Sequence, residues 1–121
     1  MKRHGYRNAI FGKWHLGHRQ KFLPLQNGFD EYAGLICSND MWPVDYDGNP
    51  LSGTKKSYYP PMSFWENNEP SELISTLKDQ GQLTKKITER AVNFINENKK
   101  NPFFLYIPHP MPHQPIAASE M

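Results

Sequence analysis

The feature that most constrains the fold is an amphipathic segment followed directly by an apolar run. Apolar residues recur at helical spacing, which predicts a helix over 84–98 that is capped by Thr84. The unbroken apolar run that follows, 102–107, is expected of a central strand buried on both faces. Two earlier strands are predicted over 6–14 and 29–36. Strand, helix and strand in this order predict an α/β fold, with a mainly parallel sheet flanked by helices.

Residues 39–70 form a long stretch that is rich in proline, glycine, asparagine and tyrosine. A stretch of this length without regular structure predicts a functional loop or an insertion. Its aromatic side chains suit stacking on sugar rings, and packing within the loop would explain them equally well. These aromatic residues are Trp42, Tyr46, Tyr58, Tyr59 and Trp65.

Composition limits the chain to one modest domain and excludes several classes of protein. With 121 residues, 13% of them aromatic, the chain is suited to an ordered core. A formal net charge of +2 with scattered lysines provides no basic stripe, so we expect no nucleic-acid partner. No apolar run reaches the length of a membrane-spanning helix, and the basic N-terminal residues lack the apolar segment of a signal peptide.

The single cysteine, Cys37, excludes an internal disulfide and a zinc site built from cysteines. Apolar residues precede it and no neighbouring base is evident, so we expect a buried structural thiol and not a nucleophile. The next three residues, Ser38, Asn39 and Asp40, have the composition of a turn.

Residues 12–17 (GKWHLG) hold a lysine and a histidine two positions apart. Alternation along an extended strand would place Lys13 and His15 on one face and Trp14 on the other, where it packs. Two proton-bearing groups side by side suit a bound anion. The spacing is equally compatible with a solvated lysine and an incidental histidine at an exposed strand end.

Residues 108–115 (PHPMPHQP) follow the predicted apolar strand and carry two histidines. The carboxyl ends of strands in α/β sheets are where ligands bind. Four prolines are expected to keep the segment extended and stiff, and they exclude the helix on which His109 and His113 would share a zinc ion. A fixed histidine at this position suits general acid catalysis or contact with an oxyanion.

Three stretches, in this order, resemble segments of the sulfatase family, part of the alkaline-phosphatase superfamily. They are residues 5–17 (GYRNAIFGKWHLG), 27–43 (NGFDEYAGLICSNDMWP) and 83–115 (LTKKITERAVNFINENKKNPFFLYIPHPMPHQP). The resemblance covers nearly the whole chain and implies a partial sulfatase-like α/β domain that hydrolyses sulfate monoesters. In this family a hydrated formylglycine attacks the sulfur, and a calcium ion helps to neutralise the charge of the transferred group.

The resemblance also implies roles for individual residues. Lys13 would contact the sulfate and the formylglycine, and His15 would hydrogen-bond the formylglycine hydroxyl. Ser38 falls where some arylsulfatases place a polar residue near the sulfate. His113 corresponds to the histidine that contacts the sulfate ester and can protonate the leaving alcohol, whereas His109 has no firm counterpart. The implied substrate is a sulfate-ester small molecule or a sulfated carbohydrate, and family members are commonly periplasmic, secreted or lysosomal.

The chain departs from the family pattern at several points. It lacks the formylglycine signature (Cys or Ser, any residue, Pro or Ala, any residue, Arg), the early paired aspartates that bind calcium, and the later Asp-Asn ligands with the second active-site lysine. We therefore expect residues 1–121 to be a central fragment of a sulfatase catalytic domain, with the calcium ligands outside this chain and no metal ligand within it. Such a fragment would be inactive without the remainder of the domain, and its strand at 102–107 would expose apolar surface.

Two alternatives remain open. A phosphodiester or phosphonate hydrolase of the same superfamily is the first, and its nucleophile would be an unmodified threonine or serine. A non-catalytic relic that only binds anions is the second, and its sulfate binding would require Lys13 and His113.

Overall fold

The structure is a computed structural model that describes residues 1–120. It contains a five-stranded sheet with the strand order β4-β3-β2-β1-β5. The strands are β1 (Arg7–Lys13), β2 (Glu31–Leu35), β3 (Ser63–Glu66), β4 (Glu69–Leu73) and β5 (Phe103–Tyr106). The helices are α1 (Leu77–Gly81) and α2 (Leu83–Asn98), with the 3-10 helices η1 (Lys2–His4), η2 (Gln20–Phe22), η3 (Pro24–Asn27) and η4 (Lys55–Tyr58).

Three strands form the parallel part of the sheet. β1 pairs in parallel with β2 on one side and with β5 on the other, so all three carboxyl ends lie at the same edge. β3 pairs antiparallel with β2, and β4 antiparallel with β3, so the sheet as a whole is mixed. These pairings, with α2 between β4 and β5, confirm the predicted α/β class.

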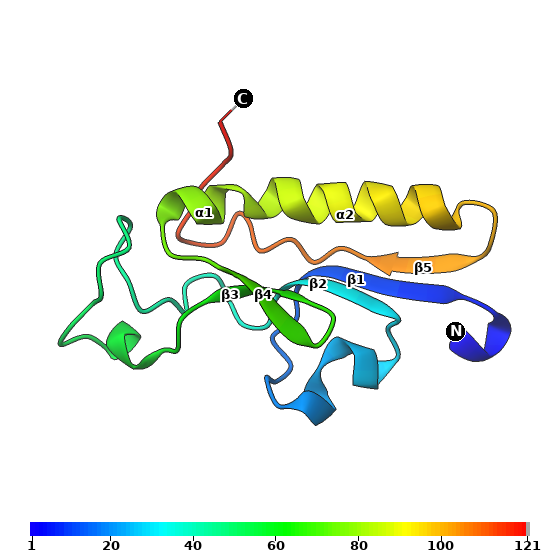
Figure 1. Cartoon of the computed structure of the whole chain (residues 1–121), viewed down its shortest axis with the longest axis horizontal. Helices are drawn as coiled ribbons and strands as arrows, with labels where there is room; N and C mark the ends of the chain where they lie inside the picture. Colours follow the sequence, from blue (N-terminus) through cyan, green and yellow to red (C-terminus); the bar gives the residue numbers. More distant parts are fainter. Residues whose placement is uncertain (121) are drawn as a thin grey trace.

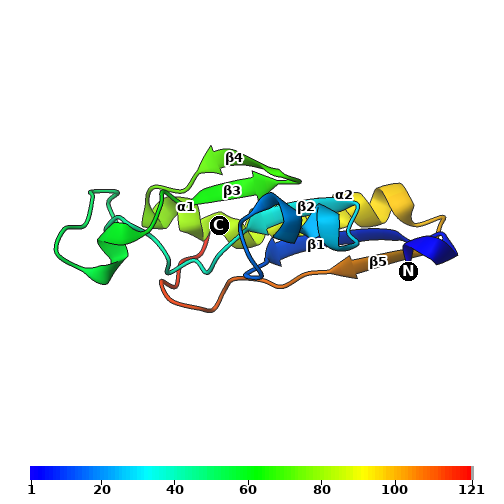
Figure 2. The ribbon, with the colours of Figure 1, turned by 90° about the horizontal axis from the view of Figure 1, so that it is seen from below.

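Side chains of β1 alternate between two apolar layers. Ala9 and Phe11 pack with Ile87 and Phe94 of α2 in the larger apolar cluster. Ile10 belongs to a second, smaller cluster on the other face of the sheet. Figure 1 shows α2 along one face and η2–η3 along the other, and Figure 2 shows the sheet from the side of η2–η3. β1 and β2, in the middle of the sheet, are therefore covered on both faces, as the α/β pattern predicts.

β5 lies at the edge of the sheet and not in its centre. Phe103 and Leu105 pack against the cluster beneath α2, whereas Phe104 and Tyr106 are 37% and 51% exposed. The prediction of a central strand buried on both faces is therefore wrong for this chain, and the expected exposure of apolar surface is confirmed. An apolar run shows that both faces of a strand can be covered, but not which strands stand beside it.

The region predicted to be irregular, 39–70, is shorter in the structure. β3 and β4 form a hairpin that begins inside it, with Asn67 in the turn at a φ of +55°. The Asn67 Oδ1 accepts a hydrogen bond from the Tyr32 N–H at 3.1 Å, so the turn also binds β2. Residues 39–62 project from one end of the sheet (Figure 1) and contain only η4 and an isolated β-bridge.

The helix predicted over 84–98 is confirmed, because α2 covers these residues. Its predicted N-cap is wrong, since Thr84 already lies inside α2. The N-cap of α2 is Gln82, whose side chain makes no capping hydrogen bond. A capping box occurs at α1 instead: the Thr76 hydroxyl accepts from the Asp79 N–H, and the Asp79 carboxylate accepts from the Thr76 N–H. α1 is too short to show an apolar period in the sequence. Neither helix within residues 1–120 has the length and apolar character needed to cross a bilayer.

The carboxyl ends of the parallel strands approach one another too closely for side chains. A Cβ atom on Gly12 would lie 2.1 Å from the Pro108 carbonyl oxygen, and one on Gly34 would lie 1.9 Å from the Gly12 carbonyl oxygen. Gly12 also has a φ of +139°, which disfavours other residues. The close approach lets the Lys13 N–H donate to the Pro108 carbonyl at 2.7 Å, which ties the end of β1 to the chain after β5.

We expect Gly12→Ala to destabilise the fold severely, because an added methyl group has no space beside Pro108. The free energy of unfolding, measured in urea, should fall by at least about 3 kcal/mol. Gly28→Ala is the matched control, since Gly28 also has a positive φ (+99°) but no atom within 4 Å of an added Cβ. Its loss should stay near about 1 kcal/mol. Equal losses for the two variants would contradict a steric role of Gly12.

Candidate functional site

All four predicted site residues lie at or after the carboxyl ends of the parallel strands, with His15 two residues after the end of β1. Lys13 ends β1, Ser38 lies shortly after β2, and His113 lies in the segment after β5. Figure 1 shows these strand ends on one side of the sheet, with the orange segment after β5 passing beside β1. This edge is where α/β proteins bind ligands.

Trp14 anchors the end of β1 on the face of the sheet opposite α2. Its ring packs edge-on against Phe29, with ring centroids 6.1 Å apart, and its Nε1–H donates to the Phe22 carbonyl at 2.8 Å. By strand alternation the half-buried Lys13 lies on the other face, the face of Phe11. The expected packing of Trp14 is confirmed, and the direction of the Lys13 side chain stays a prediction.

His15 leaves the strand. β1 ends at Lys13, and His15 has a φ of +55°, outside the extended region. Strand alternation therefore does not place it beside Lys13, and the prediction that both side chains share one strand face is wrong. His15 is exposed, but its N–H donates to the Ile36 carbonyl at 2.9 Å, which ties it to the chain after β2. A positive φ is costly for histidine, and such strain recurs at functional sites.

Ser38 carries a buried hydroxyl without a partner. The residue is 4% exposed, and its Oγ makes no hydrogen bond within residues 1–120. Buried polar atoms are nearly always paired, because an unpaired one costs free energy. The Asp40 carboxylate lies nearby without a hydrogen bond of good geometry, so the Ser38 hydroxyl can turn either to Asp40 or to a bound group such as an oxyanion.

His113 lies in a turn and not in an extended segment. Its N–H donates to the Pro110 carbonyl at 3.1 Å, and the chain bends over 111–115. The prediction of an extended segment is therefore wrong, whereas the expected exclusion of a helix is confirmed for these residues. The His113 Nδ1 lies 2.8 Å from the Gln114 carbonyl oxygen, so Nδ1 donates its proton there, and Nε2 has no hydrogen-bond partner among residues 1–120. The exposed ring can present Nε2 to a ligand.

Asp40, which the sequence assigns to a turn, lies near His113. Burial opposes its ionisation, but the nearby Ser38 hydroxyl, its own backbone N–H and the positive charges of His113 and Lys56 outweigh burial and hold the Asp40 pKa below its usual 3.8. Asp40 therefore carries a negative charge near the histidine at neutral pH. No spacing in the sequence indicates this neighbourhood, because the two residues belong to distant parts of the chain.

Asn39 joins the chain after β2 to the segment that carries His113. Its side chain is fully buried, and its Nδ2–H groups donate to the His113 carbonyl at 3.1 Å and to the Gln80 Oε1 at 3.2 Å. Sequence reasoning assigned Asn39 to a turn and found no role for Gln80. Only their burial in the structure identifies these two amides.

Cys37 is half-buried and packs against the smaller apolar cluster. Burial raises the pKa of its thiol above the ordinary value of 9.0, so the thiol stays protonated at neutral pH. Both observations support the expected structural thiol and argue against a nucleophile.

The aromatic residues of the segment 39–62 divide between packing and exposure. Trp42 is buried, and its Nε1–H donates to the Ile74 carbonyl at 3.0 Å. Tyr46 stacks on Trp42 with centroids 6.4 Å apart but is 61% exposed, and Tyr58 is 89% exposed. Packing explains Trp42, whereas Tyr46 and Tyr58 have ring faces open to a ligand.

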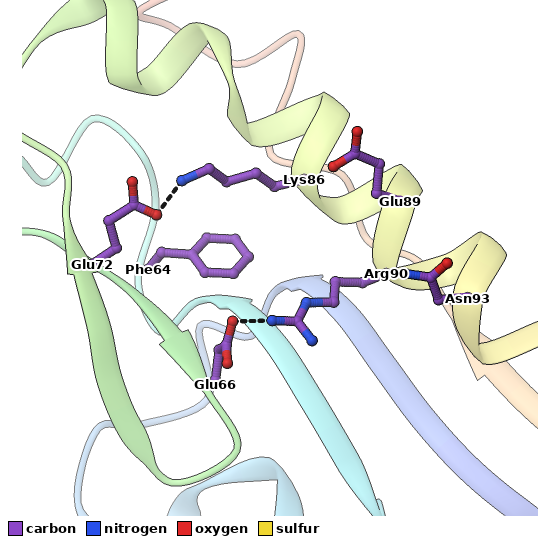
Figure 3. A pocket seen from close by; sticks show the side chains of 7 residues that line it. All are labelled: Phe64, Glu66, Glu72, Lys86, Glu89, Arg90 and Asn93. Atoms are coloured by element: carbon purple, nitrogen blue, oxygen red, sulfur yellow. Dashed lines mark hydrogen bonds and ion pairs between the residues drawn. The ribbon is translucent and has the colours of Figure 1, made fainter.

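A groove of about 280 Å³ lies between the β3–β4 hairpin and α2 (Figure 3). Lys86 and Arg90 of α2 form ion pairs with Glu72 and Glu66 of the hairpin, and the Lys86 ammonium lies 5.7 Å from the centre of the Phe64 ring. None of the predicted site residues lines this groove. Its two cations already have partners, so the groove connects the hairpin to α2.

The described residues do not fit a metal site. Among residues 1–120, no three histidine, cysteine, aspartate or glutamate side chains form a group that could hold a metal ion. Calcium requires several oxygen ligands, and a single carboxylate such as that of Asp40 is not enough. We therefore assign no step at this site to a metal ion.

Comparison with protein families matches residues 1–121 to the family described as Sulfatase. The chain is 35% identical to N-acetylgalactosamine-6-sulfatase of Mus musculus, over 98% of this chain and 22% of that protein. It is 30% identical to arylsulfatase G of Mus musculus, over 98% of this chain and 25% of that protein. The chain thus spans a quarter or less of the length of these curated relatives.

Solved structures share the fold. The PsFucS1 sulfatase from Pseudoalteromonas sp. matches with a TM-score of 0.77 and 23% identity, over 94% of this chain and 26% of that chain. At this identity the match concerns the fold alone. Ps i-CgsB in complex with k-i-k-neocarrahexaose matches with a TM-score of 0.61 and 30% identity, over 91% of this chain and 25% of that chain.

We expect Asp40→Asn to reduce the dependence of the free energy of unfolding on pH in the acid range. Because folding holds the Asp40 pKa below its unfolded value of 3.8, the ionised carboxylate contributes stability above that pH, and this is lost as the pH falls through the lower folded pKa. The free energy of unfolding, measured in urea from about pH 6 to about pH 3, should therefore fall less in Asp40→Asn than in the parent. Asp47→Asn, at an exposed aspartate, is the control. An unchanged slope in Asp40→Asn would contradict the assignment.

Proposed function

Since this chain belongs to the sulfatase family, we propose that it forms one side of an active site that hydrolyses sulfate monoesters. The observation that supports this most directly is that Lys13, Ser38 and His113 follow the carboxyl ends of three parallel strands at one sheet edge. We further propose that residues 1–121 are a central part of a larger catalytic domain. The chain spans 22% of N-acetylgalactosamine-6-sulfatase, which supports a domain that extends beyond these residues. Turnover would require the rest of that domain.

Lys13 and Ser38 are proposed to bind the sulfate group. The Lys13 ammonium would neutralise the sulfate oxygens, and the buried Ser38 hydroxyl would turn from Asp40 to donate a hydrogen bond to one of them. His15 is proposed to hydrogen-bond the formylglycine hydroxyl that the family resemblance implies. Such preorganised donors accelerate the reaction when they bind the transition state more strongly than the substrate.

His113 is proposed to protonate the leaving alcohol. Its Nδ1–H is directed to the Gln114 carbonyl, so Nε2 would carry the transferred proton. As the ester S–O bond breaks, the proton passes to the departing oxygen and the alcohol leaves neutral. The negative charge of Asp40 nearby would offset the positive charge of the protonated ring.

The nucleophile and the calcium ion are proposed to come from outside this chain. Cys37 is the only cysteine, and its raised thiol pKa argues against nucleophilic attack. A calcium ion bound in the complete domain would supply further positive charge to the sulfate. The residues of this chain are proposed only to bind the sulfate ester and to transfer a proton.

The proposed substrate is a sulfated carbohydrate or a smaller sulfate ester. One relative is named N-acetylgalactosamine-6-sulfatase, and Ps i-CgsB was solved in complex with k-i-k-neocarrahexaose. In this chain, the exposed rings of Tyr46 and Tyr58 offer faces on which sugar rings can stack. These observations support a carbohydrate as the carrier of the sulfate ester.

Sulfate binding by the chain is the first test. In NMR titrations with sodium sulfate we expect saturable shifts of the amides of Lys13, Ser38 and His113. Lys13→Ala should abolish the shifts, whereas Lys21→Ala, which removes an exposed lysine of η2, should leave them unchanged. Stronger shifts with phosphate would favour a phosphate-ester hydrolase, and no shift with either anion would contradict the proposal.

In a form of the protein that carries the complete catalytic domain, Lys13→Ala should affect catalysis more than folding. We expect kcat/KM for 4-nitrophenyl sulfate to fall by about 100-fold or more, because one preorganised cationic donor is lost. The urea midpoint should change little, since Lys13 is only half-buried. Unchanged turnover in a folded variant would refute the assignment of Lys13.

For the same form of the protein, we expect His113→Ala to act mainly on esters with poor leaving groups, because these need the proton. With sugar and alkyl sulfates kcat/KM should fall by about 100-fold or more, and with activated aryl sulfates by much less. His109→Ala is the control, since His109 is an exposed histidine in the same segment. An equal loss on all esters would argue against an acid role for His113.

A further inference from the structure

We infer that the buried side chains of Asn39 and Gln80, here called the amide clamp, position His113 beside Ser38 and Asp40. Both are positioning residues, because they act through the backbone of the segment that carries His113. The inference rests on the proposed role of His113 in catalysis. It extends that proposal by identifying what holds an exposed histidine at a fixed place.

The Asn39 amide is the centre of the clamp. It is 0% exposed, and its Nδ2 lies 3.2 Å from the Gln80 Oε1, 3.1 Å from the His113 carbonyl oxygen and 3.3 Å from the Pro115 carbonyl oxygen. With the amide turned over, Oδ1 would face these three acceptors, so the network determines its orientation. Because Nδ2 has two hydrogens for three acceptors, at least one hydrogen is shared, and the Asn39 side chain faces the backbone carbonyls on both sides of Gln114.

Gln80 connects Asn39 to α1. Its side chain is also 0% exposed, and its Nε2–H donates to the Asn39 carbonyl at 2.8 Å while its Oε1 accepts from the Asn39 side chain. Two hydrogen bonds between the same residues fix both the backbone and the side chain of Asn39. The capping box of Thr76 and Asp79 in turn orders the start of α1.

A separate contact supports the same arrangement. A Cβ atom on Gly81 would lie 2.7 Å from the Ala118 carbonyl oxygen, so the chain after His113 passes directly against α1. The segment is held upstream as well, where the Lys13 N–H donates to the Pro108 carbonyl at 2.7 Å. His113 therefore lies between an upstream anchor on β1 and a downstream anchor on Asn39 and α1.

Within residues 1–120, the hydrogen bonds from Asn39 are the only ones that connect residues 109–115 to a distant part of the chain. The remaining hydrogen bonds of the segment are local, namely His109 to Ile107, His113 to Pro110 and the His113 ring to Gln114. Local bonds shape the turn but do not fix it relative to Ser38 and Asp40. The clamp therefore fixes the position of His113 relative to Ser38 and Asp40.

The test compares Asn39→Ala and Gln80→Met with Asn8→Ala in the whole chain. Gln80→Met keeps a side chain of similar length while removing both hydrogen bonds. Asn8 is the matched control, because it is a 4% exposed asparagine whose Nδ2–H donates to the Gly28 carbonyl at 3.1 Å, near the other end of β1. The readouts are nuclear Overhauser contacts between His113 and residues 38–40, and urea unfolding.

Both clamp variants should lose the contacts of His113 with residues 38–40 while the contact of Lys13 with Pro108 persists. Asn8→Ala should keep both sets of contacts, even where its loss of stability is similar. Folded clamp variants in which His113 keeps its contacts would overturn the inference. Gln80→Met is the milder change, so it decides the outcome where Asn39→Ala fails to fold.

Sulfate titration distinguishes a failure of the clamp proposal from a failure of the proposed function. If the parent binds sulfate, we expect the clamp variants to bind it about tenfold more weakly, with the shift lost at His113 and retained at Lys13. A parent that does not bind sulfate would count against the proposed function, and the contacts of His113 would still test the clamp. Unaltered sulfate affinity together with displaced His113 would show that the clamp positions a residue that the anion does not use.

Discussion

The backbone contact between Gly12 and Pro108 is the constraint on which the rest of the site depends. Because neither Gly12 nor Gly34 has a side chain, the carboxyl ends of β2, β1 and the chain after β5 converge. The convergence brings the Lys13 N–H within 2.7 Å of the Pro108 carbonyl oxygen. Side chains at these positions would separate β1 from its neighbours, and the residues that follow the strands would no longer meet at one edge.

The two helices α1 and α2 connect the apolar core to the candidate site. α2 covers the sheet with buried residues such as Ile87 and Phe94, and α1 precedes it with one residue between them. A helix of five residues is not stable alone, so α1 depends on its capping box and on α2. Gln80 on α1 then fixes Asn39, and Asn39 fixes the turn with His113. Burial of the core thereby orders a polar, exposed part of the molecule.

Repeated local patterns made α2, β1 and β2 predictable, because each depends on residues close together in the sequence. Motif resemblance predicted Lys13, Ser38 and His113 as site residues, and the structure shows only that they lie at one sheet edge. Three features were not predictable from local patterns. The place of β5 depends on which strands flank it, the positive φ of His15 breaks strand alternation, and the amide clamp joins residues 41 positions apart.

The hydrogen bonds that order the site do not depend on whether the exposed face of β5 is covered. Phe104 and Tyr106 are the side chains that β5 leaves exposed, and additional protein against them would bury apolar area and add stability. The hydrogen bonds that order the site are internal to residues 13–113, from Lys13 to Pro108 and from Asn39 to His113. Additional protein against β5 would stabilise the fold, but the hydrogen bonds that order the site form without it. The chain can therefore keep the proposed anion-binding edge in order, even where turnover requires the formylglycine and the metal ion that we propose come from outside it.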